Sequence, residues 1–198
     1  MRPFREHTGV VVPLDRNNVD TDQIIPKQFL KRIERTGYGE FLFYDWRYAA
    51  DGKPLADFVL NRPQYAGASI LVSGKNFGCG SSREHAAWAL SNYGIRVVIA
   101  PTFADIFNTN AGNNGILLVR LPEPEIQELL HRAQAEGYRL HVSLLDKVVN
   151  DDQGFRAGFE IDDFRRTCLL EGLDEIGLTL KHDADIAAFE QNRAQRAW

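Results

Sequence analysis

The chain has 198 residues, of which 44% are hydrophobic and 25% charged, so we expect one soluble globular domain over residues 1–198. Its net charge of −4 argues against a nucleic-acid partner and against an anionic membrane surface. No apolar run approaches the ~18 residues of a membrane span, and Met1–His7 lacks the apolar core of a signal peptide, so a cytoplasmic protein is expected.

The first third of the chain predicts one strand followed by loops and short helices. The strand covers residues 8–13, where three valines precede a proline that is expected to end it. Residues 15–22 form a polar loop, and residues 24–33 carry apolar side chains at helical spacing that Pro26 limits to a short, broken helix. Five aromatic residues between positions 41 and 48 favour core packing or an interface over a stacking platform.

From residue 68 onward, predicted strands and helices alternate. Strands are expected at 68–73, 95–100 and 115–120, followed by helices at 82–93, 102–110 and 123–136. Three shorter strands at 139–143, 146–150 and 155–161 look antiparallel, with a hairpin connection at 151–154, and helices at 162–171 and 183–193 close the chain. This order predicts an α/β domain whose mixed parallel and antiparallel sheet is flanked by helices.

The most informative segment runs from Gly74 to His85 and reads GKNFGCGSSREH. It follows an apolar strand and precedes a helix-forming run, so it predicts a glycine turn at a helix N-terminus, where unpaired N–H groups favour an anion. Ser81 and Glu84 have the spacing of a capping box. Arg83 adds a cation in the first turn, where the helix dipole disfavours it, and this charge hints at a ligand. A well-capped helix without a ligand is the plainer alternative.

Three other kinds of site do not fit the residues. A dinucleotide fingerprint needs a third glycine where Arg83 stands, and an acidic residue that the next strand does not supply. A nucleophile elbow needs Gly-x-Ser-x-Gly, whereas residues 80–83 read Gly-Ser-Ser-Arg. Only Cys79 and Cys168 supply thiols, and five scattered histidines have no metal-binding spacing, so no metal or iron–sulfur cluster is expected on this chain.

Three motifs in one order carry a resemblance to a known family. Gly80–Ala87 resembles the serine loop of the swivelling fourth domain of aconitases. Asn76–Cys79 and Asp20–Pro26 are similar to the free-standing version of that domain, the small subunit of 3-isopropylmalate dehydratase, a leucine-biosynthesis enzyme. The similarity covers nearly the whole chain and takes in Phe41–Tyr48, Phe103–Asn110 and Leu169–Leu180. It implies an aconitase fourth-domain-like fold over residues 1–198.

The resemblance also implies a chemistry. The family moves a hydroxyl between adjacent carbons and converts 2-isopropylmalate to 3-isopropylmalate through an alkene. Its four-iron, four-sulfur cluster sits on a separate large subunit and binds the leaving hydroxyl as a Lewis acid. The implied partners are therefore that large subunit and a small-molecule substrate, and the chain alone is expected to be inactive. A homoaconitase, a methylmalate-type hydro-lyase and a non-catalytic binding module of the same fold are the alternatives.

The family's site residues can be carried over to matching positions of this sequence. The resemblance implies Ser81 as the base at the carbon next to a carboxylate, and Asp22 as a catalytic group that orients it. Ser82 and Arg83 would hold a substrate carboxylate. A catalytic role for His85 stays open. Four residues would cap the helix or support the loop: Gly78, Gly80, Glu84 and His85.

Substrate choice is expected to depend on the segment after the Asp-Thr-Asp motif. Aconitase-like members carry an arginine there for a third carboxylate, whereas residues 29–33 of this chain read Phe-Leu-Lys-Arg-Ile. Leu30 would suit an isopropyl group, and Lys31 and Arg32 are further substrate-binding candidates. Arg32 lies within one residue of the expected arginine, so isopropylmalate and a tricarboxylate such as homoaconitate both stay open. The plain alternative is that Leu30 only packs.

Overall fold

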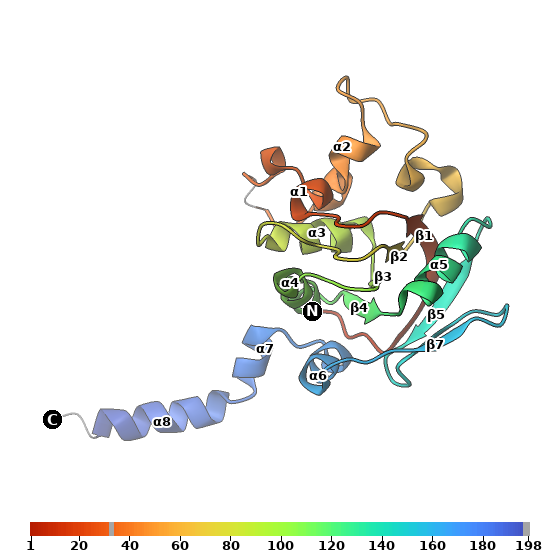
Figure 1. Cartoon of the computed structure of the whole chain (residues 1–198). Helices are drawn as coiled ribbons and strands as arrows, with labels where there is room; N and C mark the ends of the chain where they lie inside the picture. The colour runs from red at the N-terminus through yellow and green to blue at the C-terminus, as the bar shows by residue number, and fades with distance from the viewer. Residues whose placement is uncertain (32–33, 196–198) are drawn as a thin grey trace.

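The computed structural model describes residues 1–31 and 34–195. Its centre is a seven-stranded sheet in the order β4-β3-β2-β1-β5-β6-β7 (Figure 1). β2, β3 and β4 continue β1 in parallel, and β5, β6 and β7 continue it antiparallel, which confirms the predicted mixed sheet. The strands are β1 (Glu6–Leu14), β2 (Ile70–Ser73), β3 (Val97–Ala100), β4 (Leu117–Arg120), β5 (Arg139–Ser143), β6 (Val148–Asn150) and β7 (Arg156–Gly158).

Alternate residues of the parallel strands point into two separate cores. Val12, Leu71 and Val98 belong to the first core. The second core holds the residues next to them in sequence: Val11, Ile70, Val72, Val97 and Ile99. Helices α3 (Glu84–Tyr93) and α4 (Asp105–Asn113) cover the first core, and α5 (Glu123–Arg132) and α6 (Asp163–Glu171) cover the second. Because both faces of these strands are buried, their sequences read as continuous apolar runs.

The long connection between β1 and β2 adds short elements to the first core. Phe43 is fully buried there, and the ring of Phe29 stacks on that of Phe41 with centroids 4.1 Å apart. Phe43 therefore packs in the core and Phe41 and Trp46 pack against it while partly buried, in line with the core alternative of the prediction. The connection contains α1 (Thr21–Ile24), η1 (Lys27–Phe29), η2 (Tyr38–Phe41), α2 (Tyr44–Arg47), η3 (Val59–Asn61) and η4 (Pro63–Tyr65).

Pro13 does not end the first strand, contrary to the prediction. β1 continues to Leu14, and Pro13 pairs in register with Val72 of β2. The N–H of Val11 points to the β5 side, where it donates to the Tyr138 oxygen at 3.0 Å. The nitrogen of Pro13 points to the same side, beyond the end of the β1–β5 pairing, so its missing N–H removes no ladder bond.

The C-terminal part of the chain departs from the body of the domain. α7 (Glu175–Leu180) was not predicted, whereas α8 (Asp183–Gln195) matches the predicted last helix closely. α8 extends away from the sheet (Figure 1), and its side chains are exposed from residue 183 to residue 193. Among the described residues, no helix is long and apolar enough to cross a membrane.

Candidate functional site

The predicted serine loop, residues 74–83, lies where the carboxyl ends of parallel strands meet. The N–H of Gly78 donates to the Val19 oxygen at 2.7 Å, and the N–H of Thr21 donates to the Cys79 oxygen at 2.9 Å. Phe77 exchanges two backbone hydrogen bonds, both 3.1 Å, with the segment after β3. The connections that follow β1, β2 and β3 are thus joined through their backbones around this loop.

Two glycines give the loop its path. Gly78 has a φ of +78° and Gly80 a φ of +90°, a backbone region that side chains rarely adopt. A Cβ at Gly78 would also come within 2.6 Å of three carbon atoms of Phe107 on α4. A Cβ at Gly80 would approach the Asp20 Cβ to 3.3 Å. Position 78 therefore requires glycine both because of its backbone conformation and because a side chain would overlap Phe107. Position 80 requires glycine chiefly because of its backbone conformation.

The predicted capping box of Ser81 and Glu84 is wrong. α3 begins at Glu84, its N-cap residue is Arg83, and no side chain caps it. Arg83 is extended, with φ −140° and ψ 116°, so Ser81 lies two residues before the N-cap. Glu84 Oε1 instead accepts a hydrogen bond from Asn114 Nδ2 at 3.4 Å.

A capping box does exist nearby, in a segment that the sequence predicted as a plain loop. Asp20 Oδ1 accepts from the N–H of Gln23 at 2.8 Å, and Gln23 Oε1 accepts from the N–H of Asp20 at 3.0 Å. The pair has the Asp-x-x-Gln spacing of a helix start, so the signal was present in the sequence. This box fixes the four-residue helix α1, which carries Thr21 and Asp22.

Asp22 and Arg83 form an ion pair across the site. Arg83 Nη1 donates to Asp22 Oδ1, and Lys27 Nζ lies 3.6 Å from Asp22 Oδ2. Burial by itself raises the pKa of the Asp22 carboxyl, but the hydrogen bond and charge of Arg83, with the charge of Lys27, hold that pKa below its usual value. The arginine side chain is 11% exposed, so the charge that the helix dipole disfavours is balanced by a protein carboxylate.

Both serines of the loop are exposed to solvent. The hydroxyl of Thr21 donates to the backbone oxygen of Ser81 at 2.8 Å. α1 therefore contacts the loop at three points: the Thr21 N–H at Cys79, the Thr21 hydroxyl at Ser81, and Asp22 at Arg83. The structure brings three predicted residues together, Asp22, Ser81 and Arg83, with Ser82 between the last two. Thr21 was missed, since no local pattern marks its contact to Ser81, so far along the chain. Lys27 was also missed, although it lies only five residues after Asp22.

His85 packs among aromatic rings. Its ring centroid lies 4.5 Å from that of Trp88 and 5.4 Å from that of Tyr38. Burial is the main cause that lowers the pKa of His85; the Arg83 charge acts in the same direction and Glu84 opposes it. The imidazole is therefore neutral near pH 7, and its ring contacts join the first turn of α3 to Tyr38 of η2.

The predicted specificity segment is only partly described. Leu30 is half-buried and packs against the first core, and Lys31 is exposed. Arg32 lies outside the described residues. The packing of Leu30 leaves part of its side chain accessible, which is compatible with an apolar contact to a ligand.

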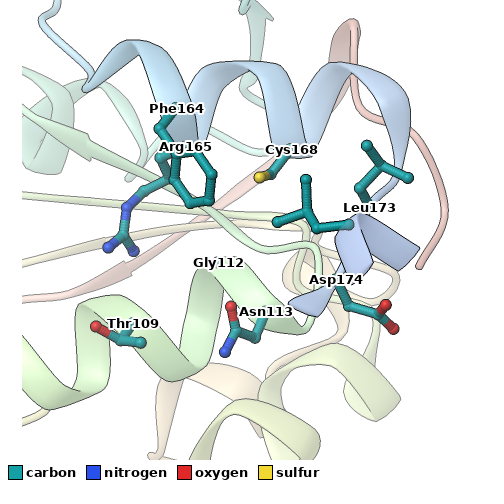
Figure 2. A pocket seen from close by; sticks show the side chains of 9 residues that line it. Thr109, Gly112, Asn113, Phe164, Arg165, Cys168, Leu173 and Asp174 are labelled. Atoms are coloured by element: carbon teal, nitrogen blue, oxygen red, sulfur yellow. The ribbon is translucent and has the colours of Figure 1, made fainter. Parts of the chain in front are cut away.

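The cysteines lie in different places. Burial raises the pKa of the Cys79 thiol, which is in the serine loop, and that of the Cys168 thiol on α6. Cys168 and Leu173 line a cavity of about 120 Å³ between α4, α6 and α7 (Figure 2), and no residue of the serine loop lines it. Within residues 1–31 and 34–195, no three His, Cys, Asp or Glu side chains are grouped to hold a metal ion.

Comparison with known proteins agrees with the resemblance. Residues 1–124 match the family described as the aconitase C-terminal domain, and residues 175–198 match the C-terminal domain of the 3-isopropylmalate dehydratase small subunit. A solved structure of a 3-isopropylmalate dehydratase from Methanocaldococcus jannaschii shares the fold, with a TM-score of 0.69 and 24% identity over 92% of this chain and 98% of that one.

Two curated relatives are named 3-isopropylmalate dehydratase small subunit. The protein from Acidobacterium capsulatum is 61% identical over 100% of this chain and 94% of its own length. The protein from Brevibacillus brevis is 57% identical over 98% of this chain and 100% of its own length. By this similarity, which spans both the serine loop and α1, the chain belongs to the family of 3-isopropylmalate dehydratase small subunits.

Proposed function

We propose that this chain is the serine-bearing subunit of a cytoplasmic hydro-lyase that converts 2-isopropylmalate to 3-isopropylmalate in leucine biosynthesis. The observation that carries the proposal is the grouping of Asp22, Ser81 and Arg83, which α1 and the loop after β2 bring to one edge of the sheet. A binding module that had lost the reaction would not need a serine placed beside an arginine whose charge is held by a carboxylate. The names of the relatives support isopropylmalate as the substrate.

In this proposal Ser81 accepts the proton from the carbon next to a substrate carboxylate. Because Ser81 lies two residues before the N-cap of α3, it gains less than the ~0.3–2 kcal/mol of a first-turn position. Lowering its pKa by one unit requires about 1.4 kcal/mol. The helix dipole therefore lowers the pKa of the hydroxyl by no more than about one unit. The remaining decrease in the pKa of the Ser81 hydroxyl must come from Arg83, the N–H groups of the glycine turn and the exclusion of water.

Arg83 is suited to hold the carboxylate beside that carbon. Its Nη1 is taken by Asp22, and the other N–H donors of the guanidinium can grip a substrate carboxylate in two-pronged fashion. The hydroxyl of Ser82 is exposed and follows Ser81 directly, where it can donate to the same group. Asp22 then fixes the orientation of Arg83.

The family's cluster does not fit this chain. Two cysteines, one in the serine loop and one beside the cavity of α6, cannot ligate four irons. We therefore propose that a separate large subunit holds the cluster, and we assign to this chain only the proton transfer and the grip on the carboxylate. The exposure of both serines agrees with a site completed by a second chain, which would exclude water from Ser81.

Ser81→Ala tests the proposed function in enzyme reconstituted with a cluster-loaded large subunit. Turnover of 2-isopropylmalate should fall about 10²–10⁴-fold, the usual contribution of a general base. Because Ser81 caps no helix, the melting temperature and the binding of the large subunit should match those of the parent. Ser91→Ala, the same change seven residues into α3, is the control and should keep parental turnover. Turnover of Ser81→Ala within about tenfold of the parent, below the usual effect of a lost base, would contradict the proposal.

A further inference from the structure

We propose that Thr21 is a positioning residue that fixes the backbone of Ser81 for proton transfer. The inference rests on the proposed role of Ser81 as the base. The Thr21 hydroxyl donates to the Ser81 backbone oxygen at 2.8 Å, and the residue is 2% exposed. In the described part of the chain, this is the one hydrogen bond that reaches Ser81.

Thr21 holds the loop on both sides of Gly80. Its N–H donates to the Cys79 oxygen at 2.9 Å, and its hydroxyl donates to the Ser81 oxygen at 2.8 Å. Between these two points the backbone passes through the left-handed region at Gly80, with φ +90°. Two carbonyl oxygens that flank one left-handed residue are thus bound by one threonine, which sets the direction in which the chain enters Ser81.

The position of that hydroxyl is itself fixed. Thr21 is the first residue of α1, directly after the Asp20 cap, so the capping box with Gln23 sets its backbone. A β-branched side chain in a helix has few χ1 rotamers, and burial restricts Thr21 further. The contact to Ser81 is therefore made by a preorganised donor.

The expected effect is on rate more than on stability. A base must lie within hydrogen-bond reach of the proton that it removes, and a displacement of about 1 Å costs on the order of 10²-fold in rate. Ser81 as a whole is exposed and its hydrogen bond with Thr21 is only partly buried, so we expect water to reach the Ser81 backbone oxygen when the Thr21 hydroxyl is removed. Loss of the donor should thus free the serine backbone without leaving a buried group unpaired.

The experiment compares Thr21→Val, which removes the donor and keeps the shape, with Thr21→Ser, which keeps the donor. Both are measured in enzyme reconstituted with the large subunit, alone and combined with Ser81→Ala. Thr21→Val should lower kcat about 10–100-fold with a nearly unchanged KM, and Thr21→Ser should recover most of the turnover. In the Ser81→Ala background, Thr21→Val should cause no further loss, because residues that act as one unit are not additive.

The outcomes separate this inference from the function on which it rests. Parental turnover of Ser81→Ala would contradict the proposed role of Ser81 as the base. Slow turnover of Ser81→Ala together with parental turnover of Thr21→Val would contradict only the positioning role of Thr21. The same conclusion would follow if Thr21→Val lowered turnover as much in the Ser81→Ala background as it does alone. Melting temperature and capture by the large subunit show whether each variant is folded. If Thr21→Val does not assemble, Thr21→Ala replaces it in the same cycle, with the same expected absence of further loss.

Discussion

Replacing Gly78 by alanine should destabilise the chain far more than the same change at Gly52. Both glycines have a φ of +78°, so the left-handed backbone costs about 1–2 kcal/mol at either position. A Cβ at Gly52 meets nothing within 4 Å, whereas a Cβ at Gly78 overlaps Phe107. Phe107 is buried and packs edge-on against Phe77 with centroids 5.4 Å apart, so it cannot move freely. Overpacking adds about 1–3 kcal/mol, which gives roughly 2–5 kcal/mol for Gly78→Ala.

Urea unfolding followed by tryptophan fluorescence measures both free energies of unfolding in water. Gly52→Ala is the matched control, because it shares the backbone cost and lacks the overlap. Adding Phe107→Leu to Gly78→Ala should restore part of the lost stability by making room for the methyl group. Equal losses for the two alanine variants would refute the steric argument and leave only the backbone cost.

Three further predictions concern charge, substrate and the last helix. Burial raises the pKa of the Asp22 carboxyl, but Arg83 and Lys27 lower this pKa overall. The carboxylate therefore stabilises the folded chain fully at pH values above its pKa in the unfolded chain, and this stabilisation is lost as the pH falls through its pKa in the folded chain. The difference in melting temperature between the parent and Asp22→Asn should therefore be constant above about pH 5 and narrow below about pH 4, and a constant difference down to pH 2 would contradict the pairing. Leu30→Arg should reduce turnover of isopropylmalate more than turnover of a tricarboxylate analogue, and equal losses would remove the specificity role. A chain that ends at Lys181 should keep its melting temperature within about 2 °C, because side chains 183–193 are exposed, whereas a drop beyond about 5 °C would show that α8 stabilises the body.

The sheet was predictable because burial on two faces leaves a plain pattern in sequence. Strands such as Val97–Ala100 are apolar throughout, and the helices between them have helical spacing, so element types were predicted correctly. Ends of elements were less predictable. Pro13 continues its strand because its nitrogen faces the side on which β1 has no further pairing, and α5 ends at Arg132, before the predicted residue 136.

The candidate site also has a part that the sequence predicts and a part that it does not. Local motifs and the family resemblance predicted Asp22 and residues 81–83 as site residues, but did not predict the contacts between them. The Ser81–Glu84 spacing matched a capping box, yet α3 begins only at Glu84, and the Ser81 backbone oxygen instead accepts a hydrogen bond from Thr21, far earlier in the chain. A local pattern cannot report such a long-range competitor. The capping box at Asp20 was readable, and the helix that it starts is only four residues long, too short for hydrophobic periodicity to reveal.

The shared strand β1 has a consequence for the order in which a newly made chain can fold. Every element around the serine loop lies before residue 115, whereas the first half of β1 pairs with β5, where Glu6 faces Ser143. As synthesis proceeds, the site half of the sheet can form before β5 is made, since β2, β3 and β4 follow one another within residues 70–120 and β1 pairs with β2. Its second face, which includes Ile70 and Val97, then stays uncovered until α5, β5 and α6 emerge. We therefore expect the nascent chain to expose an apolar surface at the stage when its serine loop is already formed, and aggregation to compete with folding at that stage.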